Sequence, residues 1–182
     1  LEVCNMDLRI QKTRNSIYEA FIELRGKKPL EKITIRELTD KAKISKQTFY
    51  LHYKDIYDLS EHLEKELIDT MMEGITFPDN ILQHAGEITL QLFSHIVVQG
   101  HLFKIIFSDS RQSVLVDSIE RIFKSAIYAK QPELRADLKT NIYVTVLVQG
   151  CYNAYEQYST IDQERVIEIL SEICESITAS YM

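Results

Sequence analysis

Polar side chains that can hydrogen-bond to DNA gather in the N-terminal third of the chain. Ser45 is an N-cap candidate, so a helix is expected to begin directly after it. That helix would carry Lys46, Gln47 and Thr48 outward while Phe49 points inward. A short helix led by polar side chains fits the DNA major groove and can read base edges. A solvated helix face is the other interpretation, and the neighbouring elements decide between the two.

A second short helix is predicted immediately before this one. Thr34 and Glu37 have the spacing of a capping box, in which each residue satisfies a free amide of the first turn. Leu38 and Ala42 follow on one helix face, four residues apart, and Ile44 is the apolar residue of the turn. Two short helices joined by a tight turn form a helix-turn-helix, which favours DNA contact.

The segment 34–53 and its continuation resemble the TetR family of transcriptional regulators. The resemblance is carried by TIRELTDKAKIS followed by KQTFYLHYKDIYDL and is specific over about residues 13–63. Three residues depart from the family pattern. Lys43 stands in the turn where glycine is common, Thr39 where a small alanine is common, and Ile56 where a phosphate-contacting lysine is common. A non-glycine residue in a left-handed turn costs about 1 kcal/mol.

The resemblance implies which side chains contact DNA. Lys46 and Thr48 are expected to reach base edges, and Gln47 is a candidate adenine reader that can also lie along the groove. Tyr50 is assigned to the surface, where its hydroxyl would contact a phosphate, and Tyr53 is assigned to the core. The full predicted set of DNA-contacting residues is Thr34, Arg36, Ser45, Lys46, Gln47, Thr48, Tyr50, His52 and Lys54.

Charge is divided unevenly along the chain, whose net charge is −6. Residues 1–54 hold 12 Lys and Arg against 7 Asp and Glu, a balance of +5, whereas residues 55–182 hold 9 against 20, a balance of −11. Solvated helix faces could produce such a split, but a basic head on an acidic body also suits phosphate contact. We therefore predict a helix-turn-helix DNA-binding domain at 1–54 and a helical ligand-binding and dimerisation domain at 55–182.

The pattern of the whole chain predicts an all-α fold of about nine helices, because strand-like alternation is nearly absent. Outside the helix-turn-helix, helices are expected at 8–24, 56–72, 81–98, 112–129 and 132–158, with a short apolar segment at 101–107. The last helix is expected to start with a capping box at Thr160 and to end near Tyr181. The inward face of helix 81–98 is predicted to hold Leu82, Ala85, Ile88, Leu92 and Ile96.

Cysteine usage and hydropathy argue against several classes of protein. Cys4, Cys151 and Cys174 form no CxxC motif and no zinc spacing, so we expect free thiols, with the last two as buried structural residues. No catalytic constellation is visible, so neither an enzyme nor a cofactor or metal site is predicted. The apolar runs fall short of the roughly 18–20 residues of a membrane span, and the start lacks a signal pattern, so a cytoplasmic protein is expected.

Two further sets of residues in the acidic part invite a functional interpretation. The last helix carries more apolar surface than one side of a helix needs. It is either buried on two sides within one subunit or part of a four-helix dimer interface, as the resemblance implies. The predicted interface residues are Val146, Gly150, Asn153, Ala154, Ile169, Ile173 and Ile177. Aromatic residues can line a ligand cavity or fill a core. The pocket candidates are Phe93, His101, Phe103, Phe107, Tyr128, Tyr143 and Tyr152.

The resemblance thus implies a dimeric, ligand-responsive DNA-binding transcriptional regulator. A repressor released from a pseudo-palindromic DNA operator by an unknown small-molecule effector is the favoured interpretation. A two-fold homodimer suits recognition helices that enter half-sites one DNA turn apart, roughly 34–36 Å. The alternative is a transcriptional co-activator or interaction module whose C-terminal domain binds a protein partner.

Overall fold

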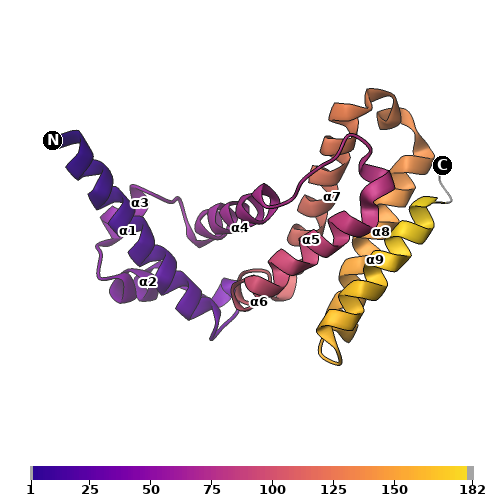
Figure 1. The fold of residues 1–182 in the computed structure, drawn as a ribbon. Coiled ribbons are helices and arrows are strands. Elements are labelled where there is room, and N and C mark those ends of the chain that lie inside the picture. Colours follow the sequence, from indigo (N-terminus) through magenta and orange to yellow (C-terminus); the bar gives the residue numbers. More distant parts are fainter. Residues whose placement is uncertain (1, 180–182) are drawn as a thin grey trace. The chain divides into compact units, whose positions relative to one another are not determined.

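The computed structural model describes residues 2–179, with side chains from residue 8 onward. Its α-helices are α1 (Glu2–Arg25), α2 (Ile35–Ala42), α3 (Lys46–Tyr50), α4 (Ile56–Glu73), α5 (Ala85–Val98), α6 (Gly100–Ile106), α7 (Gln112–Lys130), α8 (Leu138–Tyr158) and α9 (Gln163–Ala179) (Figure 1). Four 3-10 helices lie between them: η1 (Leu30–Lys32), η2 (Ile81–His84), η3 (Asp109–Arg111) and η4 (Pro132–Ala136). The described residues contain no strand, and the predicted all-α fold class is confirmed.

Two predicted helices prove to be composite. The segment 81–98 forms η2 before α5 begins, and the segment 132–158 forms η4 before α8 begins. Asp137 separates η4 from α8 and caps the latter, because its Oδ2 accepts hydrogen bonds from the Thr140 amide at 2.8 Å and from the Thr140 hydroxyl at 2.6 Å. Apolar spacing alone does not distinguish a 3-10 turn from the first turn of an α-helix, which explains both errors.

The predicted start of the last helix is also wrong. Asp162 rather than Thr160 provides the cap, because Asp162 Oδ1 accepts a hydrogen bond from the Arg165 amide at 3.0 Å and α9 begins at Gln163. The predicted end near Tyr181 lies outside the described residues. None of the helices in the described range is both long enough and apolar enough to cross a membrane.

The chain divides into two compact units. The first comprises Leu1–Leu67 together with His101–Arg111, and the second comprises Ile68–Gly100 together with Gln112–Met182. The division between the units falls inside α4, not at its start. The separation of residues 1–54 from 55–182 therefore remains a prediction about which segment contacts DNA.

In the first unit, α1, α2 and α3 pack around Phe21, Leu38 and Phe49, which are fully buried. The segment after α6 is fastened to the end of α1. Arg25, itself only 4% exposed, donates to the Ser108 carbonyl at 3.0 Å and to a carboxylate oxygen of Asp109 at 3.3 Å. The helix-turn-helix thus belongs to a packed body that includes a segment more than fifty residues further along the chain.

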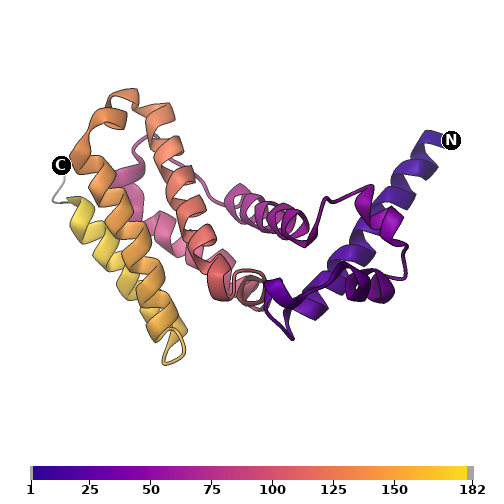
Figure 2. The ribbon, with the colours of Figure 1, turned by 180° about the vertical axis from the view of Figure 1, so that it is seen from behind.

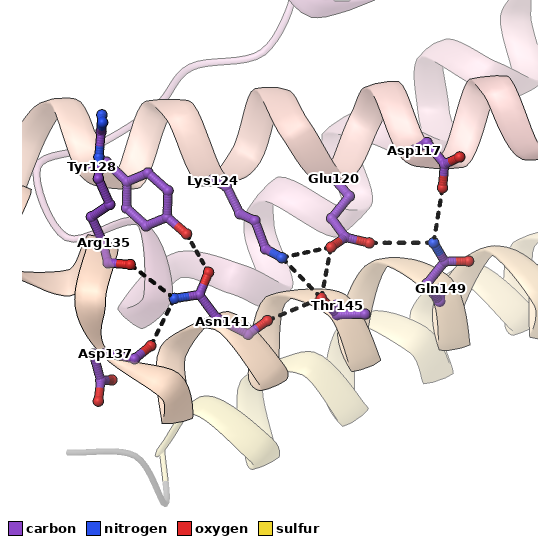
Figure 3. A network of polar contacts seen from close by, with 9 residues as sticks. All are labelled: Asp117, Glu120, Lys124, Tyr128, Arg135, Asp137, Asn141, Thr145 and Gln149. Atoms are coloured by element: carbon purple, nitrogen blue, oxygen red, sulfur yellow. Dashed lines mark hydrogen bonds and ion pairs between the residues drawn. The ribbon is translucent and has the colours of Figure 1, made fainter.

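The second unit is a helical bundle in which α5 lies beside α9 and α7 lies beside α8 (Figures 1 and 2). Gly86 allows the close approach of α5 and α9, because a Cβ atom there would stand 3.0 Å from the Ser171 carbonyl oxygen. Polar contacts join α7 to α8 (Figure 3). At their centre, Glu120 Oε1 accepts hydrogen bonds from Lys124 at 2.7 Å and from Thr145 at 2.6 Å.

Candidate nucleic-acid interface

The N-terminus of α2 is held by the predicted capping box. The Thr34 amide donates to the Glu37 carboxylate at 3.1 Å, and the Glu37 amide donates to Thr34 Oγ1 at 3.3 Å. Hydrogen bonds from Lys28 and Thr34 lower the pKa of Glu37 to about 2. The Thr34 hydroxyl itself donates to Glu37 at 2.7 Å, so it serves the cap instead of pointing freely toward a phosphate.

The turn between α2 and α3 is tight although it contains no glycine. Lys43 adopts the left-handed conformation, with φ 55° and ψ 43°, and the Ile44 amide donates to the Thr39 carbonyl at 3.1 Å. The lysine bears the cost of about 1 kcal/mol that this conformation carries without glycine. Thr39 is buried, and its hydroxyl donates to the Ile35 carbonyl at 2.8 Å, so no polar group is left unsatisfied.

Helix α3 presents two unpaired polar side chains. Ser45 caps the helix by accepting the Thr48 amide at 3.0 Å, and the fully buried Phe49 sets the inner face. Lys46 and Gln47 are exposed, and within the described part of the chain neither side chain has a hydrogen-bond or ionic partner. Thr48 is half-buried, and its Oγ1 lies 2.8 Å from Ser45 Oγ. A base contact through the Thr48 hydroxyl would therefore compete with the cap.

Tyr50 and Tyr53, which follow the buried Phe49, lie at the surface and in the core respectively, as the sequence predicted. Tyr50 is 55% exposed and packs edge-on against Phe49, with ring centroids 5.6 Å apart. Tyr53 is 4% exposed and belongs to the core. Leu51 is 78% exposed, a large apolar side chain beside the outward tyrosine to which the sequence assigned no role. One exposed leucine does not disturb the helical spacing of apolar residues, so no pattern in the sequence indicated that Leu51 is exposed.

The candidate cations of the head are all accessible to solvent. Arg36 and Lys54 are exposed and His52 is half-buried. Arg36 has only a long contact with Asp40, 3.8 Å between Nε and Oδ2, and Lys54 engages Asp58 through its backbone amide at 2.9 Å. The nine predicted DNA-contacting residues all lie in the first unit, at the start of α2, on α3 with its N-cap, and in the loop between α3 and α4.

An apolar cavity of about 60 Å³ lies inside the second unit. The predicted inward face of helix 81–98 forms part of its wall, with Leu82, Ala85, Ile88, Leu92 and Ile96 all lining it. Phe123 of α7 and Val144 of α8 also line it, as do Cys151 and Cys174, which were predicted only as buried structural residues. The volume is well below the roughly 300–1,000 Å³ of ligand pockets, so a larger ligand requires the wall to move.

The seven pocket candidates do not form one site. Phe93 and Tyr152 line the cavity. Phe103 and Phe107 are buried in the first unit, where their rings stack 5.6 Å apart, and His101 is exposed on α6.

Two of these candidates instead join surface contacts of the second unit. Tyr128 contacts Asn141 and lies under the Arg135 guanidinium at 5.5 Å, and Tyr143 lies under Lys139 at 5.7 Å (Figure 3 shows the Tyr128 contacts). Aromatic composition cannot separate these environments, because it carries no information on which helix faces meet.

Exposed apolar side chains follow α8 and α9. Ile142 and Val146 on α8 are 54% and 56% exposed, and Ile173 on α9 is 44% exposed. Of the predicted interface residues, Val146, Gly150, Asn153, Ile169 and Ile173 are exposed, and Ala154 and Ile177 are partly exposed. A Cβ atom added at Gly150 would meet no atom within 4 Å. Several large apolar side chains exposed on two neighbouring helices are typical of an interaction site.

The head has the architecture of a helix-turn-helix DNA-binding unit, with a capped second helix that exposes its polar residues. Within the described range, no three His, Cys, Asp or Glu side chains gather as metal ligands would. The class that the fold and these residues define is the all-α proteins with a helix-turn-helix head.

Comparison with known proteins agrees with this class. No protein-family model matches the chain. The chain is 28% identical over 118 residues to the uncharacterized HTH-type transcriptional regulator YxbF of Bacillus subtilis (strain 168), a match that covers 57% of this chain and 31% of that protein. The matched region is thus about a third of that relative's length.

The solved structures include one with a similar fold. It is a TetR-family transcriptional regulator from Streptomyces coelicolor, with a TM-score of 0.59 and 15% sequence identity over 94% of this chain and 84% of that one. The predicted resemblance to the TetR family is confirmed at the level of the fold. Both similar proteins are named as transcriptional regulators, in agreement with the prediction that the chain is not an enzyme.

Proposed function

We propose that the protein is a homodimeric transcriptional repressor that binds a pseudo-palindromic DNA operator and is released from it by a small-molecule effector. The observation that carries the DNA-binding part is the state of α3. Its inner face is fixed by Phe49 and its start by Ser45, while Lys46 and Gln47 are exposed without partners. A helix that is held in place and presents free donors is prepared for base contacts in the major groove.

Backbone contacts would come from the residues around α3. Tyr50, Lys54 and Arg36 are exposed, and such groups position a protein on phosphates without reading sequence. Because Thr34 is engaged in its capping box, we assign the phosphate contact at the start of α2 to backbone amides and to Arg36. The Leu51 side chain adds an apolar surface that could contact sugar or a thymine methyl group.

The dimer would form through α8 and α9. A helix-turn-helix protein that reads two half-sites needs a two-fold axis, and an interface on one self-complementary patch supplies it. We assign that patch to the exposed apolar residues of α8 and α9, among them Ile142, Val146 and Ile173. Gly150, with no atom near its Cβ direction, lets a second helix approach closely.

The effector would enter the apolar cavity of the second unit. Because that cavity is only about 60 Å³, the bound state must differ from the one described here. An effector that prefers this expanded state lowers operator affinity only by its differential binding to the two states. The apolar lining favours a compound with little charge.

Selection of binding sites from random DNA tests the DNA-binding proposal. The wild-type protein is expected to enrich an inverted repeat whose half-sites are about one DNA turn apart. Lys46→Ala should keep the repeat but lose preference at one position per half-site, because one good base contact discriminates by about 1–3 kcal/mol. Lys65→Ala, an exposed lysine on α4 with no assigned contact, is the matched control. Failure of the wild type to enrich any sequence would contradict the proposal itself, and an unchanged preference in Lys46→Ala would contradict only the role of Lys46.

A further inference from the structure

Two free cysteines from different helices meet in the interior of the second unit. Cys151 lies on α8 and Cys174 on α9, and their sulfur atoms are 3.3 Å apart. The side chains are nearly buried, with 9% of Cys151 and 2% of Cys174 exposed. At this distance one thiol donates a hydrogen bond to the other. The rest of the described chain offers neither sulfur a disulfide partner.

Both sulfur atoms lie on the wall of the apolar cavity. A cavity needs about 10–15 Å³ to hold one water molecule, so about 60 Å³ holds a reactant somewhat larger than water. Most of the other lining residues are apolar, such as Ile88 and Leu92, whose side chains do not react with hydroperoxides. The thiols are therefore the reactive groups that a molecule inside the cavity meets.

The hydrogen bond between the sulfurs makes them chemically unequal. With Cys151 as the donor, the contact stabilises a thiolate on Cys174 and lowers the pKa of Cys174. The same contact, together with burial, raises the pKa of Cys151. The thiolate is the form of cysteine that attacks electrophiles, so Cys174 is the nucleophile of the pair. Cys151 is the thiol that then attacks the oxidised Cys174.

We propose that Cys151 and Cys174 are a redox-reactive pair, which a small hydroperoxide in the cavity oxidises to an intrachain disulfide. The Cys174 thiolate attacks the terminal oxygen of the hydroperoxide, whose O–O bond breaks, and the alkoxide leaves and takes up a proton as an alcohol or, from hydrogen peroxide, as water. The Cys174 sulfenic acid that results is attacked by Cys151, and water leaves as the S–S bond forms. Two thiols and one hydroperoxide thus yield one disulfide, one alcohol and one water.

The geometry permits this step with little movement. A disulfide bond is about 2.05 Å long, so the sulfur atoms must approach by about 1.3 Å, which side-chain rotation supplies. The bond would tie α8 to α9, the two helices that carry the proposed dimer surface. It would also remove both thiols from the cavity wall. The inference concerns the thiols alone and holds or fails independently of operator binding.

Thiol counting on the purified 182-residue chain tests the proposal. A Cys4→Ser variant contains only the two cysteines of the pair. It is reduced, freed of reductant and exposed at pH 7 to hydrogen peroxide or to tert-butyl hydroperoxide in separate reactions. The folded variant should lose both thiols at least about tenfold faster than the same variant unfolded in guanidinium. Peptide mapping without reductant should show one intrachain Cys151–Cys174 link, which dithiothreitol reverses.

Two further measurements assign the order of steps. In the double variant Cys4→Ser/Cys151→Ser, dimedone should trap a sulfenic acid on Cys174, whereas Cys4→Ser/Cys174→Ser should give little adduct. The oxidised Cys4→Ser protein should unfold about 5–10 °C above its reduced form, because the new bond restricts the unfolded chain. The hydroperoxide that oxidises the pair faster identifies the class of oxidant. Faster reaction with hydrogen peroxide indicates hydrogen peroxide itself, and faster reaction with tert-butyl hydroperoxide indicates an organic hydroperoxide.

Two outcomes would reject the proposal of a redox-reactive pair. If the folded protein keeps both thiols longer than the unfolded control does, burial protects them and the pair is structural. A disulfide found between two chains instead of within one would also reject the proposal. Both outcomes are read on the Cys4→Ser chain, in which Cys151 and Cys174 are intact, so neither depends on whether a variant of the pair folds.

Discussion

Glu64 of α4 and Arg111 of η3 form an ion pair in the interior of the first unit. Arg111 Nε donates to Glu64 Oε1 at 2.8 Å, and Ser60 Oγ donates to the same oxygen at 2.7 Å. Only 4% of the Glu64 side chain and 19% of the Arg111 side chain are exposed. The pair joins α4 to a segment 47 residues further along the chain.

Removal of one partner of this pair should destabilise the first unit strongly. Arg111→Ala is expected to lower the free energy of unfolding by about 3–5 kcal/mol, because it leaves the Glu64 carboxylate buried without its cation. The double variant Glu64→Met/Arg111→Met should recover most of that loss, since it buries no charge. Urea unfolding followed by circular dichroism measures both. Arg165→Ala, which breaks an exposed pair with Glu168, is the control and should change the free energy of unfolding far less, because solvent screens a surface pair. Equal effects of Arg111→Ala and Arg165→Ala would show that the Glu64 pair is no stronger than a surface contact.

Lys54 should contribute to operator affinity through a phosphate and not through a base. Lys54→Ala is therefore expected to weaken binding to operator and to random DNA by similar factors. It should also make the dependence of log affinity on log salt shallower by roughly one per subunit, because one fewer counterion is released at each head. Fluorescence anisotropy at several salt concentrations gives both quantities. Lys65→Ala should leave the salt slope unchanged. A Lys54→Ala protein with the wild-type slope would remove Lys54 from the interface.

Gly150 tests the proposed dimer interface. Within one chain, a side chain at this position has open space, so Gly150→Leu should fold and gain slightly in helix propensity. At a two-fold interface the leucine would overpack both copies, at about 1–3 kcal/mol each, and raise the dimer dissociation constant at least tenfold. Sedimentation velocity measures association, and circular dichroism checks the fold. Gly100→Leu is the matched control, because its Cβ direction is equally open but lies on α6. An intact Gly150→Leu dimer would place the interface elsewhere, and Ile169 and Ile173 would be tested next.

The Glu120 network between α7 and α8 should stabilise the second unit in a pH-dependent manner (Figure 3). Burial raises the pKa of Glu120, but hydrogen bonds from Lys124, Thr145 and Gln149 outweigh it and hold the pKa below the ordinary value of 4.5. A carboxylate with a lowered folded-state pKa stabilises the fold above its unfolded pKa, and this contribution is lost as the pH falls through the folded pKa.

Glu120→Gln should therefore lower the free energy of unfolding by roughly 1–2 kcal/mol at pH 7. The difference from wild type should narrow once the pH drops below 4.5. Urea unfolding at a series of pH values measures this, with Glu168→Gln as an exposed control. A difference that stays constant from pH 7 down to the acid limit of cooperative unfolding would mean that the Glu120 charge is not what stabilises the contact.

Local relationships in the sequence determined the helix-turn-helix. The capping box of Thr34 and Glu37, the strained turn at Lys43 and the opposite directions of Tyr50 and Tyr53 depend on residues at most a few positions apart. Such relationships follow from helix periodicity and backbone sterics, and both are determined by the local order of residues. The inward stripe from Leu82 to Ile96 was predictable for the same reason.

Only the tertiary structure decided which faces meet. Apolar spacing showed that Phe103, Phe107 and Phe93 are buried, but not that the first two lie in the unit with the head and the third on the cavity wall. Nor did it show that Cys151 faces Cys174, because each lies on the apolar side of its own helix whatever helix packs there. The physical reason is that burial is a property of one helix face, whereas contact is a property of two, and the pairing of faces is chosen by packing over the whole chain.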